Sequence, residues 1–538
     1  MRFGHVLDLR CQTPVMSSGP ILYSPRMSLA PYPVQPVTDD LVASAARHPH
    51  KVAFIDGVSR AEYTFIEILT AARRLGRHLQ DAGVGPGDRV GIVATNSPEW
   101  AVVFLGTLFA GGTVTTLNPL YTEREIAEQF KDSTPKAVFV VEATAHSVRT
   151  VWGGAPNFHL TNEVWVLASE AAGEAHPVEF DPLTHLAVLP YSSGTTGAPK
   201  GVMLSHYNLT CNVRQTLGSG LIDGYSVMVN FLPFFHIYGM AVLMLPGIAS
   251  GATQITMPAF DPKRFLEIVT EYQATNLFMV PPALLALANS DESTTMSSVR
   301  YIMSGAAPLP LDVARRVAER FDVTVVQGYG MTEASPVTHI SLLGRNKEGT
   351  VGPPVADTRQ KVVDLDTNET LPIGEIGELL VSGPQVMQGY YGRPDATAES
   401  ILEDDEGRWL RTGDIVTMDL DGYVTIHDRA KEMIKYKGYQ IAPAELEALI
   451  MEHPDVADVA VIPKDSGTAD GEYPKAFVVR RADTELDAAA VMAHVSAVVA
   501  PYKKVREVEF VDAIPKNPSG KILRRELKAQ ERARKDGA

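Results

Sequence analysis

Cysteine is scarce in this 538-residue chain, which contains only Cys11 and Cys211. Two thiols exclude a disulfide framework and any all-cysteine zinc or iron–sulfur site, and they suit a reducing compartment. Positive charge is also in deficit, because 48 Lys and Arg face 64 Asp and Glu, a net charge of −16. This balance argues against a general nucleic-acid or anionic-membrane binder, so we expect no nucleic-acid partner.

Long apolar runs are missing as well. Residues 224–260 contain no Asp, Glu, Lys or Arg, but prolines and glycines such as Pro233 and Gly251 divide them. The pieces are shorter than the ~20 apolar residues that a membrane span requires. We therefore expect a buried core that lines a pocket, and no stable membrane insertion.

Targeting signals are absent from both ends of the sequence. The first 30 residues lack a secretory apolar region, and the C-terminal Lys-Asp-Gly-Ala is neither a peroxisomal address nor a lipidation site. We expect a cytoplasmic protein in which residues 1–37 form a disordered or extended lead-in. Met16 and Met27 are alternative starts, and the folded part is expected to begin near Thr38.

Between about residues 40 and 430, short apolar runs alternate with amphipathic stretches. The alternation predicts an α/β fold with doubly wound, mostly parallel sheets. We expect strands at residues 89–94, 137–141, 186–190, 252–257 and 276–280, and helices at residues 99–110, 123–131 and 262–272.

The pattern changes twice toward the C-terminus. After Pro354, short apolar segments at residues 361–366, 377–382 and 422–427 predict a small β-subdomain. From residue 432 onward we expect a small α+β domain that ends in a basic helix. Its predicted elements are helices at residues 442–451 and 486–499 and strands at residues 456–462 and 476–480.

The strongest functional signal is the loop at residues 191–201, which follows a predicted strand and reads Tyr-Ser-Ser-Gly-Thr-Thr-Gly-Ala-Pro-Lys-Gly. Its glycines allow the backbone to approach an anion closely, its hydroxyls donate hydrogen bonds, and Lys200 adds a positive charge. Such a loop can hold a triphosphate. No Gly-Lys-Ser/Thr opens a helix here, so P-loop kinase or GTPase chemistry is disfavoured.

Further motifs follow this loop along the chain. They are residues 234–239 (Phe-Phe-His-Ile-Tyr-Gly), 304–308 (Ser-Gly-Ala-Ala-Pro), 328–333 (Gly-Tyr-Gly-Met-Thr-Glu), 411–414 (Arg-Thr-Gly-Asp), 428–438 (Asp-Arg-Ala-Lys-Glu-Met-Ile-Lys-Tyr-Lys-Gly) and 518–521 (Pro-Ser-Gly-Lys). Their order resembles the signature of the acyl-adenylate-forming (AMP-binding) superfamily. In detail they resemble its 4-coumarate–CoA ligase and acyl-CoA synthetase branch, over nearly everything from about residue 38 to 527.

The resemblance implies a two-step reaction. ATP and a carboxylic acid first form an acyl-AMP with loss of pyrophosphate, and the thiol of coenzyme A then displaces AMP. Cations must neutralise the two anions that meet in the first step. Lys521 resembles the catalytic lysine of that step, and Glu333 resembles the ligand of Mg²⁺, a hard cation that prefers oxygen donors.

The same resemblance implies the nucleotide contacts. Thr332 offers a hydroxyl to the α-phosphate, Asp414 accepts from the ribose hydroxyls, and Arg429 supports the ribose or phosphate. Tyr329 and Ile426 enclose the adenine, with Ala307 on its edge. The full set expected for ATP or AMP is Ser192, Ser193, Gly194, Thr195, Thr196, Gly197, Lys200, Ala307, Gln327, Gly328, Tyr329, Thr332, Asp414, Ile426, Arg429 and Lys521.

The acyl pocket is expected in and after the charge-free segment. The positions that match it are Tyr238, Val242, Met303, Ala306, Gly330, Pro336 and Val337. Met303 and Ala306 stand where plant members commonly carry Lys and Gly, while small residues still leave room for a flat aryl ring or an alkyl chain. His236 has two interpretations, a buried core histidine or a catalytic gate beside the acyl carboxylate and the thiol path.

The resemblance also implies domain movement. The large domain spans residues 38–430, the C-terminal domain spans residues 432–538, and Lys431 occupies the hinge between them. Rotation of the small domain removes Lys521 from the active site and brings the opposite face of that domain to it. That face carries the residues expected to meet coenzyme A, with Lys435 as the second catalytic lysine: Lys435, Lys437, Gly438 and Gln440.

The sequence therefore predicts an acid–CoA ligase that uses ATP, Mg²⁺ and coenzyme A, acts on a cinnamate-type or other aryl acid, and is a monomer or homodimer. A medium- or long-chain fatty acid, or transfer to a carrier protein, are alternatives within the same chemistry. A luciferase-like oxygenase needs the same motifs. A catalytically silent nucleotide-binding protein is disfavoured, because every expected catalytic position is kept.

Overall fold

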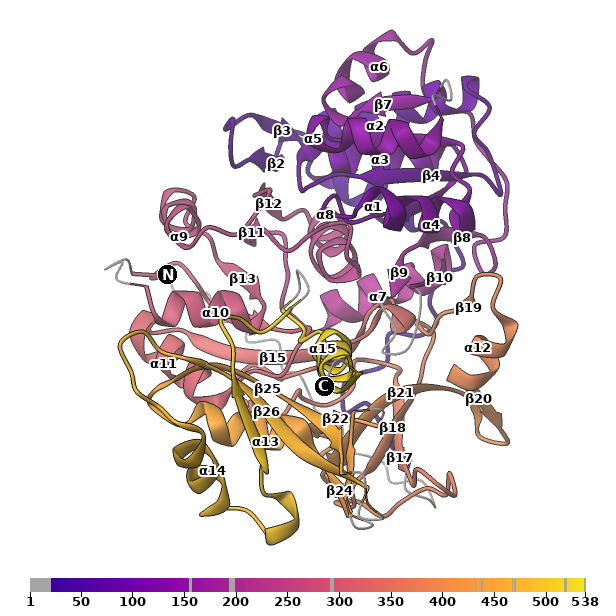
Figure 1. The fold of residues 1–538 in the computed structure, drawn as a ribbon. Coiled ribbons are helices and arrows are strands. Elements are labelled where there is room, and N and C mark those ends of the chain that lie inside the picture. Colours follow the sequence, from indigo (N-terminus) through magenta and orange to yellow (C-terminus); the bar gives the residue numbers. More distant parts are fainter. Residues whose placement is uncertain are drawn as a thin grey trace, which may run out of the picture.

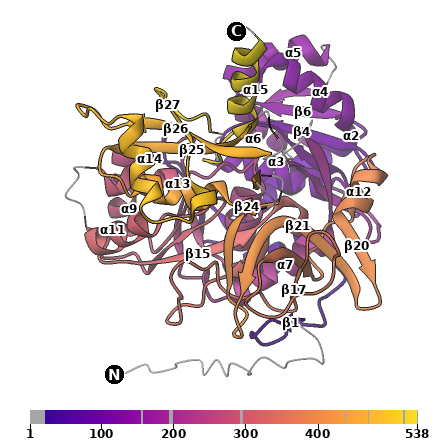
Figure 2. The ribbon, with the colours of Figure 1, turned by 60° about the horizontal axis from the view of Figure 1, so that its bottom comes forward.

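The computed structural model describes residues 21–153, 157–192, 199–290, 295–430, 432–436, 439–466, 468, 471–516 and 520–536. Within them, a large N-terminal domain is built on three β-sheets, and a small C-terminal domain packs against it (Figure 1). Figure 2 shows the small domain in front of the large one after rotation. The predicted α/β class, with a large domain and a small α+β domain, is confirmed.

The first sheet has the strand order β19-β10-β8-β5-β4-β6-β7, with β9 paired to β10, and its strands from β8 to β7 are parallel. Its strands are β4 (Arg89–Val93), β5 (Thr113–Thr116), β6 (Ala137–Val140), β7 (Phe158–Leu160), β8 (Leu186–Leu189), β9 (Tyr191–Ser192), β10 (Lys200–Ser205) and β19 (Gly389–Tyr390). The helices that lie along this part of the chain are α2 (Phe65–Asp81), α3 (Pro98–Phe109), α4 (Glu123–Ser133), α5 (Glu142–Trp152) and α6 (Val164–Glu170).

The second sheet has the order β16-β15-β14-β13-β11-β12-β2-β3 and is parallel from β15 to β2. Its strands are β2 (Val52–Asp56), β3 (Glu62–Thr64), β11 (Val227–Asn230), β12 (Thr253–Thr256), β13 (Asn276–Met279), β14 (Tyr301–Ser304), β15 (Thr324–Gly330) and β16 (Val337–Ile340). The helices here are α1 (Val37–Arg47), α7 (His206–Gly218), η2 (Tyr238–Met244), α8 (Leu245–Ser250), α9 (Pro262–Glu271), α10 (Pro281–Ala288) and α11 (Leu311–Phe321).

The charge-free segment is a core element, as its composition predicts. It contains β11, η2, α8 and β12, and nearly all residues of η2 and α8 are buried. Gly251 ends α8 with φ +84°, a left-handed conformation that glycine adopts without strain. Among the described residues, no helix has the length and apolar character needed to cross a membrane.

The third sheet has the order β1-β17-β18-β21-β20, with β22 paired to β21. Its strands are β1 (Leu22–Tyr23), β17 (Arg359–Val363), β18 (Gly377–Ser382), β20 (Ile401–Asp404), β21 (Gly407–Met418) and β22 (Val424–Arg429), and α12 (Pro394–Ser400) precedes β20. The expected start of the folded part near Thr38 is wrong. Leu22 is buried and pairs with Gln360, and a two-residue strand is too short to leave a periodic signal.

Within the described residues, the C-terminal domain consists of a hairpin, a three-stranded sheet, three α-helices and the short 3₁₀ helix η4 (Pro501–Lys503). These elements are β23 (Ile434–Tyr436), β24 (Tyr439–Ile441), α13 (Pro443–Met451), β25 (Val456–Asp465), β26 (Glu472–Arg480), α14 (Ala488–Ser496), β27 (Glu507–Phe510) and α15 (Arg524–Asp536). The basic helix predicted at the end of the chain is α15, and it begins three residues after Lys521.

Candidate active site

Four parts of the fold converge on the candidate site. The parallel strands β14 and β15 end there, β9 and β10 hold the two ends of the Ser/Gly/Thr loop, and β21 and β22 bring residues from the third sheet. The C-terminal domain contributes Lys521. Ligands of open α/β sheets bind beyond the carboxyl ends of parallel strands, so this is the expected edge of the second sheet.

Asp414 is the centre of a buried charged cluster. It is 4% exposed, its Oδ2 accepts a hydrogen bond from the Tyr329 hydroxyl at 2.5 Å, and its Oδ1 lies 3.1 Å from Arg429 Nε. Burial and the Asp414 charge raise the pKa of Tyr329, and Asp414 raises the pKa of Arg429. Tyr329 therefore stays a hydrogen-bond donor and Arg429 stays charged.

The turn before Asp414 is fixed by the backbone. Gly413 has φ +71°, and its N–H donates to the buried carboxylate of Glu378 at 3.0 Å. The Asp414 N–H donates to Thr412 Oγ1 at 3.1 Å. These bonds leave the Asp414 carboxylate free to face Tyr329 and Arg429.

Lys521 reaches this cluster from the C-terminal domain. Burial, together with the positive charge of Arg429, lowers its pKa to about 8, although Asp414 and Glu432 act in the opposite direction. The adjacent Gly520 has φ +82°, and a Cβ there would lie 2.4 Å from Pro282 at the start of α10. Gly520 is thus pressed against the large domain, at a position where only glycine fits.

Glu333 lies at the base of the Ser/Gly/Thr loop. It is 7% exposed, and its Oε1 accepts from the Tyr390 hydroxyl at 2.8 Å. Lys200 Nζ lies 4.5 Å from the centre of the Tyr390 ring, and Lys200 pairs with Ser192 in the β9–β10 ladder. The structure therefore brings Ser192, Lys200 and Glu333 together around Tyr390.

The predicted nucleotide-binding residues divide into those outside the described part of the chain and those placed near the strand ends. Those outside are Ser193, Gly194, Thr195, Thr196 and Gly197 of the loop. Tyr329 and Ile426 are half-buried and pack against the same apolar cluster. Gln327, Gly328, Ala307 and Thr332 are half-buried at or just after the ends of β14 and β15.

Four of the predicted acyl-pocket residues join one apolar cluster, namely Tyr238, Val242, Met303 and Val337. The Tyr238 ring packs against Gly305, where a Cβ would lie 3.1 Å from it. Gly330 is closed on one side, since a Cβ there would lie 2.1 Å from the carbonyl oxygen of Pro336. Ala306 is exposed and has φ +71°, a conformation that costs an L-residue energy.

His236 is half-buried beside this cluster. Its Nδ1 accepts a hydrogen bond from the Tyr238 N–H at 3.2 Å, and burial lowers its pKa to about 4. The imidazole is therefore neutral at neutral pH, and because Nδ1 is an acceptor, Nε2 carries the proton. This geometry combines a core contact through Nδ1 with a donor at Nε2.

The residues expected to meet coenzyme A lie on the β23–β24 hairpin, where Lys435 pairs with Gln440. Lys437, Gly438 and the expected hinge Lys431 fall outside the described residues.

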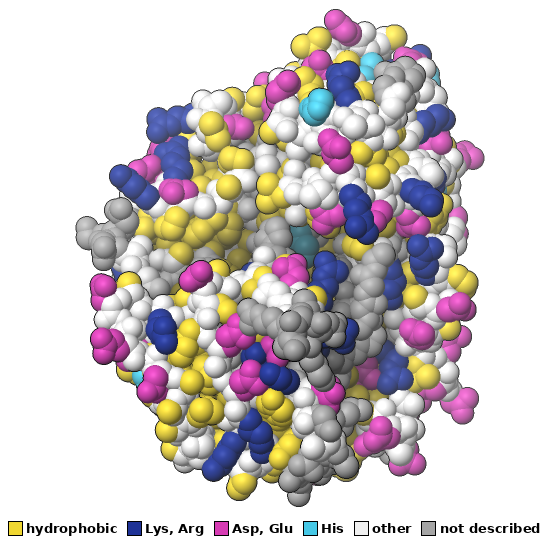
Figure 3. Space-filling view, viewed as in Figure 1, with side chains coloured by type: hydrophobic (Ala, Val, Ile, Leu, Met, Phe, Trp, Pro, Cys, Tyr) yellow, Lys and Arg dark blue, Asp and Glu magenta, His cyan; other side chains and the backbone are white. Residues whose placement is uncertain are grey.

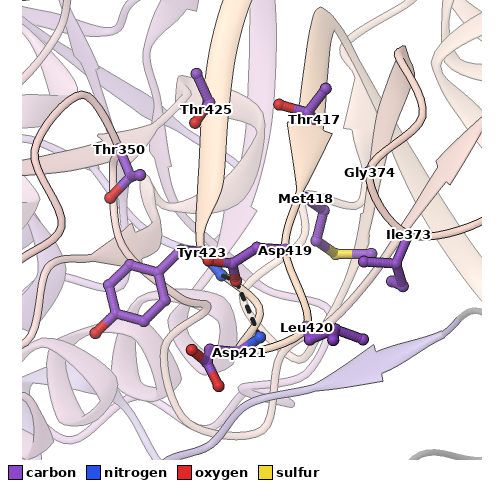
Figure 4. Close-up of a pocket in the computed structure, with 10 residues that line it drawn as sticks. All are labelled: Thr350, Ile373, Gly374, Thr417, Met418, Asp419, Leu420, Asp421, Tyr423 and Thr425. Carbon is purple, nitrogen blue, oxygen red and sulfur yellow. Dashed lines mark hydrogen bonds between the residues drawn. The ribbon is translucent and has the colours of Figure 1, made fainter.

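Two surface depressions in the described structure do not coincide with the predicted residues. One, of about 550 Å³, lies at the β21–β22 turn (Figure 4). Figure 4 shows Asp419 bonded to the backbone of that turn, with Tyr423 beside it. The other, of about 470 Å³, follows β2 and β12 and is lined by Arg60 and Arg264, among others. The space-filling view shows a hollow with hydrophobic side chains between α9 and the C-terminal domain (Figure 3).

Sequence reasoning missed three residues that shape the site. Tyr390 holds Glu333, Glu378 holds the Gly413 turn, and Arg524 lies next to Lys521 in a pair with Glu447. Tyr390 stands in a Gly-Tyr-Tyr-Gly run, whose paired aromatics between glycines were a usable signal. Glu378 and Arg524 carry no such sequence signal, because their roles depend on partners that are distant in the sequence.

Known proteins resemble this chain over most of its length. Residues 41–391 match the model of the AMP-binding enzyme family, and residues 445–521 match that of the AMP-binding enzyme C-terminal domain. The chain is 39% identical to 4-coumarate--CoA ligase 2 of Nicotiana tabacum over 88% of this chain and 91% of that protein. It is 36% identical to peroxisomal OPC-8:0-CoA ligase 1 of Arabidopsis thaliana over 95% and 96% of the two chains.

Solved structures of acid–CoA ligases and related proteins share this fold. ATP-bound MatB from Rhodopseudomonas palustris superposes with a TM-score of 0.85 at 29% identity, covering 92% of this chain and 99% of that one. Apo MatB, with the same coverage and 30% identity, superposes with a TM-score of 0.74. This chain therefore belongs to the AMP-binding enzyme family, within its acid–CoA ligases.

Proposed function

We propose that this acid–CoA ligase adenylates a cinnamate-type or other aryl acid and transfers the acyl group to coenzyme A. The observation that carries the adenylation step is that Tyr329 and Arg429 contact Asp414, while the charges of Asp414 and Arg429 both act on Lys521. One carboxylate, two cations and a hydroxyl donor, held by three different parts of the fold, fit a nucleotide with its phosphates. A structural ion pair alone does not require a partly buried lysine from a second domain.

Asp414 has the acceptor capacity that a ribose needs. A carboxylate offers about four lone-pair positions. Tyr329 and Arg429 occupy two of them, one on each oxygen. The remaining positions would accept the two ribose hydroxyls, while Tyr329 and Ile426 would enclose the adenine beside Ala307, Gln327 and Gly328.

The phosphates would lie between the loop and Lys521. Ser192 and Lys200, with residues 193–197, would contact the β- and γ-phosphates through hydroxyl, backbone and charge. Thr332 and Lys521 would contact the α-phosphate, and the lysine would also neutralise the attacking carboxylate. Its protonated form is required for that role.

Glu333 is the residue that would hold Mg²⁺. Magnesium is bound by one or two carboxylates together with phosphate oxygens and water. Glu333 is buried and oriented by the Tyr390 hydroxyl, and it lies beside Lys200 at the loop base, so its donor chemistry fits. The ion would neutralise phosphate charge there.

Thioester formation would use the other face of the C-terminal domain. We propose rotation about Lys431, which would withdraw Lys521 and bring Lys435, Lys437, Gly438 and Gln440 to the site. His236 would act as the gate between acyl carboxylate and thiol, through its Nε2–H. Its low pKa fits a neutral donor and not a base that titrates near pH 7.

The residues expected in the acyl pocket are compatible with an aryl acid. Tyr238, Val242, Met303 and Val337 share one buried apolar cluster and would supply the pocket wall, and Ala306, Gly330 and Pro336 would border the ring. The relatives include a ligase named for 4-coumarate and one named for OPC-8:0, so sequence similarity alone does not fix the acid. A medium- or long-chain fatty acid is the second candidate. Transfer to a carrier protein is the other alternative.

The test is AMP release over a panel of cinnamates, benzoates and medium- and long-chain fatty acids, each with ATP, Mg²⁺ and coenzyme A. We expect the highest kcat/KM for an aryl acid, and a clear preference for long alkyl acids would contradict the proposal. Lys521→Ala should release no AMP. Lys516→Ala is the matched control, because Lys516 lies nearby in sequence but pairs with Asp458 at 2.6 Å and should stay active.

A further inference from the structure

The helix α13 of the C-terminal domain has no N-terminal cap of its own. Its N-cap residue is Ala442, which offers no side-chain acceptor, and its first residue is Pro443, which has no N–H. The next N–H, of Ala444, donates to Asp428 Oδ2 at 2.8 Å. Asp428 lies on β22, so the large domain supplies the cap of a helix in the small domain.

The other cap of known geometry in the small domain is local. Asp487 precedes α14, and its side chain accepts from the Ala490 N–H at 2.8 Å. Both helices contain 9 residues, and both are capped by an aspartate. Asp487 and α14 belong to the same domain, whereas Asp428 and α13 belong to different domains. Asp487 is therefore a matched control for Asp428.

The helix that Asp428 caps also holds Arg524, which follows Lys521 in the chain. Glu447 on α13 accepts from Arg524 Nη2 at 2.7 Å on both oxygens, and the same carboxylate accepts from the Val461 N–H at 2.7 Å. Arg524 Nε donates to the Val461 carbonyl at 3.1 Å. Arg524 lies three residues after Lys521, so contacts run from Asp428 through α13 and Glu447 to Arg524.

We propose that Asp428 is a positioning residue that favours the domain orientation for adenylation. Its carboxylate caps α13 across the domain boundary and so holds Lys521 beside Asp414 and Arg429. The inference rests on the proposed function, because Asp428 and Ala444 lie on opposite sides of Lys431 and rotation there separates them. The chain superposes on ATP-bound MatB with a TM-score of 0.85 and on apo MatB with a TM-score of 0.74.

The test compares Asp428→Ala with Asp487→Ala in the full-length chain. One half-reaction is pyrophosphate release with ATP and acid, and the other is conversion of supplied acyl-AMP to thioester. Asp428→Ala should slow acyl-AMP formation about fivefold, because the loss of one helix cap changes an equilibrium constant by about that factor. The thioester step should be unchanged or faster. Asp487→Ala should leave the ratio of the two rates unchanged. Equal loss of both half-reactions in Asp428→Ala would overturn the proposal.

A second variant separates orientation from helix stability and from ATP binding. Ala442→Ser gives α13 a local cap, so Asp428→Ala with Ala442→Ser should regain thermal stability but not the rate ratio. Recovery of the ratio would overturn the proposal. Because Asp428 Oδ1 also accepts from the Arg429 N–H at 2.7 Å, KM for ATP is measured too. A raised KM with an unchanged rate would mean a disturbed nucleotide site and would also overturn it.

Domain orientation can be measured without any acid. Fluorescent labels at Tyr225→Cys and Val498→Cys, whose native side chains are 89% and 66% exposed, report the distance between the domains with ATP bound. Asp428→Ala should broaden the distance distribution, and Asp487→Ala should not. An unchanged distribution in Asp428→Ala would overturn the proposal. Failure of the proposed function would appear separately, as no acyl-AMP from any acid in the unsubstituted chain.

Discussion

The charge on Lys521 should limit adenylation at alkaline pH. Burial lowers the pKa of this lysine from 10.5 to about 8 in the nucleotide-free chain. Only the protonated amine can neutralise the carboxylate and the α-phosphate. The value of kcat/KM for ATP reports the ionisation of the free enzyme, so it should fall above about pH 8 and reach about one tenth of its plateau near pH 9.

The assay is pyrophosphate release across the alkaline range, at carboxylic-acid concentrations far below the KM for that acid, so that the profile reports the enzyme without bound acid. Lys521→Arg keeps its charge at every accessible pH, so its alkaline decline should disappear, even if its absolute rate is lower. Lys528→Arg is the control, since Lys528 lies on α15 and pairs with Glu432 at 3.3 Å. A flat wild-type profile to about pH 10, or the same decline in Lys521→Arg, would refute the assignment.

Three further changes test stability and metal binding. Lys521→Met should raise the free energy of unfolding by about 3 kcal/mol at neutral pH, because it removes a buried charge whose pKa falls from 10.5 to about 8. In the unfolded chain the lysine keeps its proton up to its ordinary pKa of 10.5, so the free energy of unfolding of the wild type rises between about pH 8 and pH 10.5. The advantage of Lys521→Met should therefore vanish near pH 10.5. An advantage that stays constant in urea unfolding at several pH values would contradict this. Ala306→Gly should stabilise the chain by about 0.5–1 kcal/mol, since it relieves a φ of +71°, and a loss of stability in the same assay would contradict this. Tyr390→Phe should raise the Mg²⁺ concentration for half-maximal adenylation several-fold by freeing Glu333, whereas Tyr391→Phe should not; equal effects would exclude that role.

Much of the fold could be predicted because local signals agree with tertiary structure. The strand at residues 89–94 and the helix at residues 99–110 appear as β4 and α3, displaced by one residue at most. An uninterrupted apolar run predicts a buried parallel strand, and Ser97 followed by Pro98 predicts the helix start. The Ser97 side chain does accept from the Trp100 N–H at 3.3 Å.

The contacts that complete the site could not be predicted in the same way. Glu333 and Tyr390 lie 57 residues apart in the sequence, and Glu447 and Arg524 lie 77 apart. No periodicity links such partners, and each residue type is common on surfaces. The cap of α13 was hidden for another reason: Ala442 carries no cap signal, and the acceptor Asp428 comes from a different domain.

The central claim is that two lysines of one mobile domain serve two successive steps. The direct measurement is each half-reaction in Lys521→Ala and in Lys435→Ala. We predict that Lys521→Ala forms no acyl-AMP yet converts supplied acyl-AMP to thioester, and that Lys435→Ala does the reverse. If both variants lose both half-reactions to the same extent, the two-orientation account is contradicted.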